Sequence, residues 1–185
     1  MKRAVFLDRD GVLVEPVVRD GRAIAPLTLD AFSIVPSAAA DVRRLRRAGL
    51  PCIVFTNQPE LAQGSLAPSA LATMHAALRQ TVAVDDVLVC PHHASSGCAC
   101  HKPRPGMLYQ AARTWGVSLA DSYVIGDRWR DIEAGCAGGC YTILLDRPYS
   151  ACSTADARVG SLTEAVDLVL ARIGGSQLWT SPPAT

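Results

Sequence analysis

The chain has 185 residues, 49% of them hydrophobic, and a formal net charge of +1 at pH 7. This length and composition predict a single domain with one good core. The near-neutral charge argues against a general attraction to nucleic acid or to an anionic membrane. The apolar run at 4–7 ends at Asp8, so it is too short for a signal peptide or a membrane-spanning helix. We therefore expect a cytoplasmic monomer with one domain over residues 1–173 and a loose tail over 174–185.

Strand-like and helix-like segments alternate along the chain, which is typical of a parallel sheet covered by helices on both faces. Short apolar runs predict strands at 4–7, 52–55, 87–89, 123–125 and 142–145. Helices are predicted to begin at Pro36-Ser37 and at Pro68-Ser69, and to span 106–115, 128–137 and 162–173. Residues 13–35 show no steady period and predict a long surface loop. The expected fold is a doubly wound, Rossmann-like α/β sheet.

Polar side chains follow three of these predicted strands. Asp8 and Asp10 follow the first, Thr56-Asn57-Gln58 ends the second, and Asp127 with Asp131 follows the fourth. Ligands of open α/β sheets bind at the carboxyl ends of the strands. We therefore ask of each later motif whether it completes a site at Asp8.

Taken singly, each motif also has a structural interpretation. An Asp pair after a strand is often a turn or a helix cap, and Asn57 is a common turn former. Asp127 is compatible with an N-cap, Asp131 with a solvated helix position and Arg128 with a surface charge. The order and strand context of the motifs favour the functional interpretation.

Four motifs occur in order: Asp8-x-Asp10-Gly11-Val12, Thr56-Asn57-Gln58, Lys102-Pro103-x-Pro105 and Gly126-Asp127-x-x-x-Asp131. Together they resemble the haloacid dehalogenase superfamily of aspartate-nucleophile phosphatases, over residues 4 to about 146. The resemblance implies a phosphomonoesterase that works through an aspartyl-phosphate intermediate and depends on Mg²⁺.

The resemblance gives these residues separate roles. Asp8 is the expected nucleophile, and Asp10 is the expected general acid and base. Thr56 offers a hydroxyl to the transferring phosphoryl group, and Lys102 offers a compact positive charge in a chain that otherwise uses arginine almost throughout. The expected Mg²⁺ ligands are Asp8, the Asp10 backbone carbonyl, Asp127 and, directly or through water, Asp131.

A second cluster combines three cysteines with a histidine, Cys90-x-His92-x5-Cys98-x-Cys100. Thiolates and an imidazole at this spacing predict a closed, tetrahedral Zn²⁺ site with a structural role. Reduced, unliganded cysteines are the alternative, and His93 competes with His92 as the ligand. Because the zinc loop at 90–100 ends just before His101-Lys102, we expect it to hold Lys102 over the active site.

The zinc loop narrows the resemblance to a compact form without a large cap. It is similar to the D-glycero-D-manno-heptose-1,7-bisphosphate phosphatase family, with histidinol-phosphate phosphatase as a close relative. That resemblance implies removal of the 7-phosphate, in the heptose pathway that feeds lipopolysaccharide and other surface glycans. The expected substrate-binding residues are Asn57, Gln58, His101 and Arg128.

The chain departs from that family at four places. His101 replaces an arginine that commonly precedes the motif lysine, and Arg128 replaces a common lysine. Pro59-Glu60-Leu61 stands in place of a small residue and glycine, and residues 16–22 lack a familiar Asp-His-Gly-Tyr segment. These changes bear on the sugar, the anomer and the remote phosphate contact. Rival hypotheses are a histidinol-phosphate phosphatase, a polynucleotide 3′-phosphatase, which the absence of a basic stripe disfavours, and a non-catalytic zinc-containing binding module.

Overall fold

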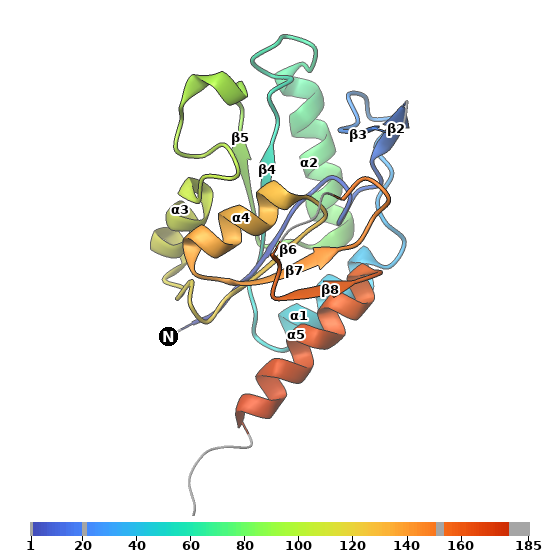
Figure 1. Ribbon diagram of the computed structural model, residues 1–185. Helices are drawn as coiled ribbons and strands as arrows, with labels where there is room; N and C mark the ends of the chain where they lie inside the picture. Colours follow the sequence, from blue (N-terminus) through green and yellow to red (C-terminus); the bar gives the residue numbers. More distant parts are fainter. Residues whose placement is uncertain (1, 20–21, 151–153, 178–185) are drawn as a thin grey trace, which may run out of the picture.

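A computed structural model describes residues 2–19, 22–150 and 154–177. Its centre is a six-stranded sheet in the order β5-β4-β1-β6-β7-β8, in which every neighbouring pair is parallel (Figure 1). The strands are β1 (Val5–Leu7), β4 (Cys52–Asn57), β5 (Asp86–Cys90), β6 (Tyr123–Gly126), β7 (Tyr141–Leu145) and β8 (Ala157–Val159). The predicted parallel α/β fold is confirmed.

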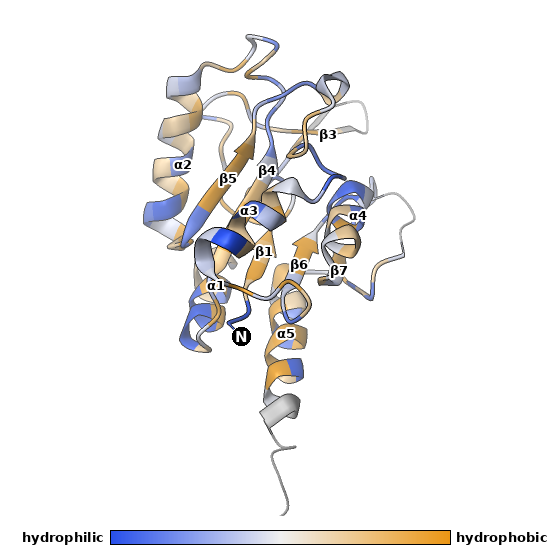
Figure 2. Ribbon diagram, turned by 90° about the vertical axis from the view of Figure 1, so that its left-hand side faces the viewer, coloured by the Kyte–Doolittle hydropathy of each residue, from blue (hydrophilic) through white to orange (hydrophobic). Residues whose placement is uncertain are grey.

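In the part of the chain that the structure describes, five α-helices cover the two faces of this sheet. They are α1 (Ala38–Arg47), α2 (Pro68–Val82), α3 (Gly106–Trp115), α4 (Trp129–Gly138) and α5 (Leu162–Gln177). One core cluster joins the sheet to residues of α1, α2 and α5, and another joins its opposite face to residues of α3 and α4. Because alternate residues of a strand face opposite sides, Val5 and Leu7 enter the first cluster and Phe6 enters the second. Both faces are covered, so the strands are the hydrophobic segments visible in Figure 2.

Three strands are absent from the sequence predictions. The expected loop at 13–35 contains an antiparallel hairpin of β2 (Val17–Arg19) and β3 (Arg22–Ile24). The dipeptide Asp20-Gly21, which lies outside the described residues, is a sequence typical of hairpin turns. A search for the hydrophobic period of a helix or a strand does not detect it. Strand β8 was not predicted, because its three residues lie at the sheet edge around the exposed Arg158 and form no apolar run.

The last helix is longer than predicted. It continues through Gly174 to Gln177, so residues 174–177 are helical and do not belong to the expected loose tail. Glycine lowers helix stability by about 1 kcal/mol relative to alanine but does not clash with the helix, so it need not end one. Residues 178–185 of the expected tail lie outside the described part of the chain.

The segment between β1 and α1 holds little regular secondary structure. In its described residues it contains only the hairpin β2–β3 in place of a large cap.

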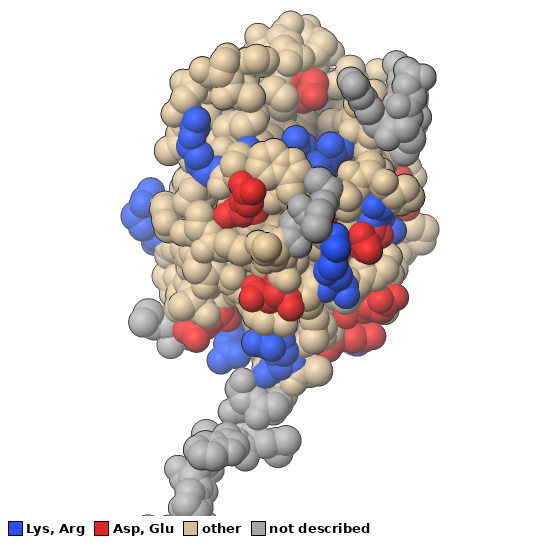
Figure 3. All heavy atoms as spheres, in the orientation of Figure 1, with Lys and Arg blue, Asp and Glu red and all other residues tan. Residues whose placement is uncertain are grey.

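On the face in Figure 3, basic and acidic side chains are interspersed. None of the helices in the described residues has the length and hydropathy that a membrane crossing needs.

Candidate active site

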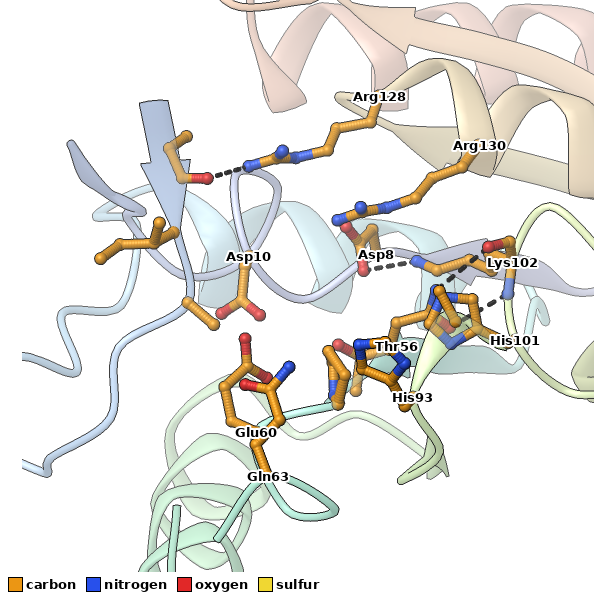
Figure 4. A pocket seen from close by; sticks show the side chains of 16 residues that line it. Asp8, Asp10, Thr56, Glu60, Gln63, His93, His101, Lys102, Arg128 and Arg130 are labelled. Carbon is orange, nitrogen blue, oxygen red and sulfur yellow. Dashed lines mark hydrogen bonds and ion pairs between the residues drawn. The ribbon is translucent and has the colours of Figure 1, made fainter. Parts of the chain in front are cut away.

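The motif residues meet where the central strands end. Strand β1 pairs with β4 on one side and with β6 on the other. Asp8 therefore follows the middle strand, between Thr56 of β4 and Asp127, which directly follows β6. Lys102 comes from the loop before α3 and reaches the same place (Figure 4).

Lys102 is buried between two carboxylates, with 2% of its surface exposed. Its Nζ lies 2.8 Å from Asp8 Oδ1 and 2.6 Å from Asp131 Oδ1, and it donates to the Phe55 carbonyl at 2.9 Å. Burial alone would lower the pKa of Lys102, but the charges of Asp131 and Asp8 outweigh it and raise the pKa. The lysine is therefore held in its charged form beside the expected nucleophile.

Three buried carboxylates form a group that fits a magnesium ion. One oxygen each from Asp8, Asp127 and Asp131 lies within 4.8 Å of the others. Burial and the negative charges of Asp131 and Asp8 raise the pKa of Asp127 to about 7. Among the described residues, Asp127 Oδ1 has no hydrogen-bond partner although it is buried. An oxygen-rich cluster with an unpaired carboxylate is the donor set that Mg²⁺ prefers.

Asp131 also fixes the start of helix α4. It accepts a hydrogen bond from the Arg128 backbone N–H at 3.0 Å, in a capping box whose N-cap residue is Arg128. The alternative interpretations of these positions are therefore wrong, because Asp127 is not the N-cap and Asp131 is fully buried.

Gly11 leaves room for Asp127. A Cβ on Gly11 would lie 2.0 Å from Asp127 Oδ2, and the backbone φ of +94° is one that other residues rarely adopt. The glycine that follows Asp10 is thus required both by the turn and by the packing of the carboxylate.

Asp10 is held by an arginine that sequence reasoning missed. The Arg9 guanidinium makes two hydrogen bonds of 2.9 Å to the Asp10 carboxylate, and its Nη1 lies 3.1 Å from His75 Nε2. Arg9 is fully buried, although it stands inside a motif in which only the aspartates attracted notice. Burial raises the pKa of Asp10 despite the opposing charge of Arg9.

The three polar residues at the end of β4 do different things. Thr56 and Asn57 line the cavity, and Asn57 exchanges two hydrogen bonds with the backbone of Lys102, at 3.1 and 3.2 Å. Gln58 has no exposed surface and does not line the cavity. It donates to Thr56 Oγ1 at 2.9 Å and to Asp10 Oδ2 at 3.0 Å, so the expected contact of Gln58 with substrate is replaced by support of these two residues.

The Cys/His cluster has the dimensions of a zinc site. Its three sulfur–sulfur distances are 3.2, 3.5 and 3.7 Å, and His92 Nδ1 lies 3.3 Å from Cys100 Sγ and 3.7 Å from Cys90 Sγ. Four sulfurs arranged tetrahedrally around Zn²⁺ would be about 3.7 Å apart, given the usual Zn–S bond. His93 turns to Ser95 instead, with its Nδ1 2.8 Å from the hydroxyl. The geometry therefore favours His92 over His93 in the cluster of Cys90, His92, Cys98 and Cys100.

A cavity of about 290 Å³ opens in front of Asp8. The hairpin β2–β3, the loop after β4, the zinc loop and the start of α4 form its walls (Figure 4). Arg128 lines it and donates from Nη2 to the Ala23 carbonyl, which ties the hairpin to α4. His101 also lines it, but its Nδ1 lies 3.2 Å from the His92 carbonyl, and burial together with Arg130 lowers its pKa. His101 thus contributes an uncharged ring where an arginine was expected from the resemblance.

Known proteins are similar to this chain in fold and in sequence. The HAD-hydrolase-like family matches residues 99–169. The crystal structure of D,D-heptose 1,7-bisphosphate phosphatase from B. bronchiseptica, complexed with magnesium and phosphate, is 29% identical with a TM-score of 0.78, covering 93% of this chain and 99% of that one. The fold and these matches define a haloacid dehalogenase-like phosphatase.

Curated relatives narrow the class. The D-glycero-beta-D-manno-heptose-1,7-bisphosphate 7-phosphatase of Pseudomonas aeruginosa is 36% identical over 149 residues, covering 76% of this chain and 79% of the relative. The corresponding alpha enzyme of Mycobacterium bovis is 34% identical over 171 residues, covering 86% and 87%. The chain belongs to the D-glycero-D-manno-heptose-1,7-bisphosphate 7-phosphatase family.

Proposed function

We propose that the protein removes the 7-phosphate of D-glycero-D-manno-heptose 1,7-bisphosphate by Mg²⁺-dependent hydrolysis. Membership of this family over most of the chain carries the proposal, together with a cavity that opens onto Asp8 and Lys102. We further propose that residues 1–173 act as one catalytic domain, as a monomer in the cytoplasm, on a small phosphorylated sugar.

In the proposed reaction, Asp8 attacks the phosphorus atom and forms an aspartyl-phosphate. The P–O7 bond breaks, and its electron pair leaves with the sugar oxygen. An anionic nucleophile approaches a phosphate dianion only where positive charge offsets the repulsion. Lys102 supplies one such charge, and the Thr56 hydroxyl donates a hydrogen bond to a phosphoryl oxygen. Mg²⁺ bound by Asp8, the Asp10 carbonyl, Asp127 and Asp131 would supply further positive charge to the phosphoryl group.

Asp10 moves the protons. Its carboxyl group protonates the departing O7 alkoxide and then takes a proton from the water that hydrolyses the aspartyl-phosphate. The raised pKa of Asp10 suits the acid role, since burial favours its neutral form. Arg9 and Gln58 hold the carboxyl group in place by hydrogen bonds to both of its oxygens.

The remaining roles concern position and recognition. We assign the zinc loop a structural role, because Cys100 is two residues from Lys102 and a closed Cys₃His set leaves no open coordination position. Asn57 orients Lys102 through its backbone, while Arg128 and the neutral His101 face the part of the substrate beyond the transferred phosphate.

A substrate panel tests the proposal. Purified protein with Mg²⁺ is assayed against both anomers of the heptose bisphosphate, histidinol phosphate and a 3′-phosphorylated DNA. We expect kcat/KM for one heptose anomer to exceed that for the other classes by at least about tenfold. Preference for histidinol phosphate or DNA would reject the substrate, and no Mg²⁺-dependent turnover of any compound would favour a non-catalytic binding module. Asp8→Asn, which keeps the side-chain volume and removes the nucleophile, is the negative control.

A further inference from the structure

Arg130 is a cavity residue that the sequence analysis did not single out. It lies in the first turn of α4 and extends into the cavity that also contains Asp8 and Lys102 (Figure 4). Its Nε is buried, and no described residue accepts a hydrogen bond from it. The side chain as a whole is half-buried, but a buried N–H donor without an acceptor is costly, so a ligand that supplies the acceptor would gain that free energy on binding.

The other cations around the reacting group already have protein partners. Lys102 is paired with Asp8 and Asp131, and Arg9 is paired with Asp10. Arg128 donates to the Ala23 carbonyl, and its Cζ lies 5.4 Å from the Tyr149 ring centroid.

A count of the charges around Asp8 shows why the positive charge of Arg130 is needed. One Lys102 and one divalent cation would neutralise the three carboxylates of Asp8, Asp127 and Asp131, and the Arg9 guanidinium is already occupied by its two hydrogen bonds to Asp10. A phosphate dianion that enters this neutral arrangement needs additional positive charge. His101 does not provide it, because its Nδ1 lies 3.2 Å from the His92 carbonyl oxygen and faces the zinc loop.

The position of Arg130 indicates whether it would bind the phosphate that is transferred or a phosphate elsewhere on the substrate. The Arg130 side chain extends into the cavity toward Asp8 and Lys102 (Figure 4). Glu60, the acidic residue of the loop after β4, lies at the opposite wall of the cavity (Figure 4). The anion-binding end of the cavity is therefore the end with Lys102 and Arg130.

We propose that Arg130 is a catalytic residue whose guanidinium donates hydrogen bonds to the phosphoryl group being transferred. This rests on the proposed function only in requiring phosphoryl transfer at Asp8, whatever the sugar. The planar guanidinium presents two parallel donors to phosphoryl oxygens, and it strengthens these contacts as charge spreads over them in the transition state.

The test uses a monophosphate, so that a second phosphate cannot contribute. Arg130→Gln, Arg130→Lys and wild type are compared in Mg²⁺ with p-nitrophenyl phosphate as substrate, and their binding of inorganic phosphate is measured by calorimetry. We expect Arg130→Gln to lose about tenfold to one hundredfold in kcat/KM and to bind phosphate more weakly, with partial recovery in Arg130→Lys. Arg113→Gln, an exposed arginine in the last turn of α3, is the matched control and should change neither value.

Two results would overturn the proposal. The first is unchanged hydrolysis and unchanged phosphate binding in Arg130→Gln. The second is a loss that appears only when the same variants are also assayed with heptose bisphosphate, which would place Arg130 at the phosphate that is not transferred. Failure of wild type to use heptose bisphosphate while it hydrolyses p-nitrophenyl phosphate would reject the proposed substrate alone, since the comparison of the Arg130 variants with p-nitrophenyl phosphate does not depend on that sugar.

Discussion

The two clusters of metal-type ligands differ in how the chain assembles them. Asp8, Asp127 and Asp131 follow two strands that are far apart in the sequence, and at most 4% of the surface of each is exposed. The zinc-type ligands all lie within residues 90–100, at the end of β5 and in the loop after it, and only Cys90 among them is fully buried. The carboxylate cluster therefore needs the pairing of β1 with β6, whereas the cysteine cluster is formed by one short segment.

The two clusters also differ in how their side chains interact with one another. The carboxylates repel one another in a buried space, and Asp127 responds with a pKa raised to about 7. The sulfurs and the imidazole lie in weak mutual contact at 3.2 to 3.7 Å. We propose that the first cluster binds positive charge during function and that the second fixes the loop that leads into Lys102.

The largest expected effect comes from breaking the carboxylate cluster at Asp127. Asp127→Asn should reduce activity by at least about one hundredfold and abolish the stabilisation by Mg²⁺, because a ligand is lost. The same change should stabilise the metal-free protein by about 1–3 kcal/mol above pH 7, since it removes one charge from a buried, repelling group. Thermal unfolding with and without Mg²⁺ measures both effects.

The sign of this stability change depends on pH. The pKa of Asp127 is raised in the folded protein above the ordinary value of 3.8, so wild type pays the penalty fully above about pH 7 and loses it as pH falls toward 4. The advantage of metal-free Asp127→Asn should therefore shrink over that range. An advantage that grows on acidification would contradict the assignment, and the exposed Asp121→Asn should show no trend.

A smaller effect is expected from breaking the sulfur cluster. Replacing Cys98 and Cys100 together by serine should remove zinc and lower kcat/KM about tenfold, because Lys102 loses the anchored loop before it. The Mg²⁺-dependent rise in thermal stability should survive, since the carboxylates are untouched. Metal analysis and kinetics check the two statements, and Cys136→Ser, a free and exposed cysteine outside the cluster, should retain zinc and activity. Full activity in a zinc-free double variant would contradict the idea that the zinc loop positions Lys102.

The same contrast explains what the sequence could predict. The sulfur cluster was predictable because its spacing is local, and the strand-end positions of Asp8 and Asp127 followed from short apolar runs in a parallel sheet. The hairpin β2–β3 and the edge strand β8 were missed, because they are short and carry no apolar period.

Side-chain partners were less predictable than strand ends. Gln58 was expected at the substrate, but its side chain lies beneath the cavity against Asp10 and Thr56. Arg9 and Arg130 were overlooked because an arginine in an arginine-rich sequence carries no pattern of its own. Their importance depends on which acceptors the fold brings near them, and this is a property of tertiary structure.

The smallest predicted effect distinguishes two adjacent histidines. His92→Ala should lower zinc occupancy, because the ring nitrogen stands 3.3 Å from Cys100 Sγ within the cluster. His93→Ala should retain zinc and raise KM no more than about threefold, since His93 lines the cavity and bonds to Ser95 without joining the cluster. Zinc content of the two purified variants, measured beside their kinetics, checks the assignment. Zinc loss in His93→Ala with retention in His92→Ala would exchange the two roles. It would also require the backbone at these two residues to adopt another conformation, in which His93 faces the cysteines.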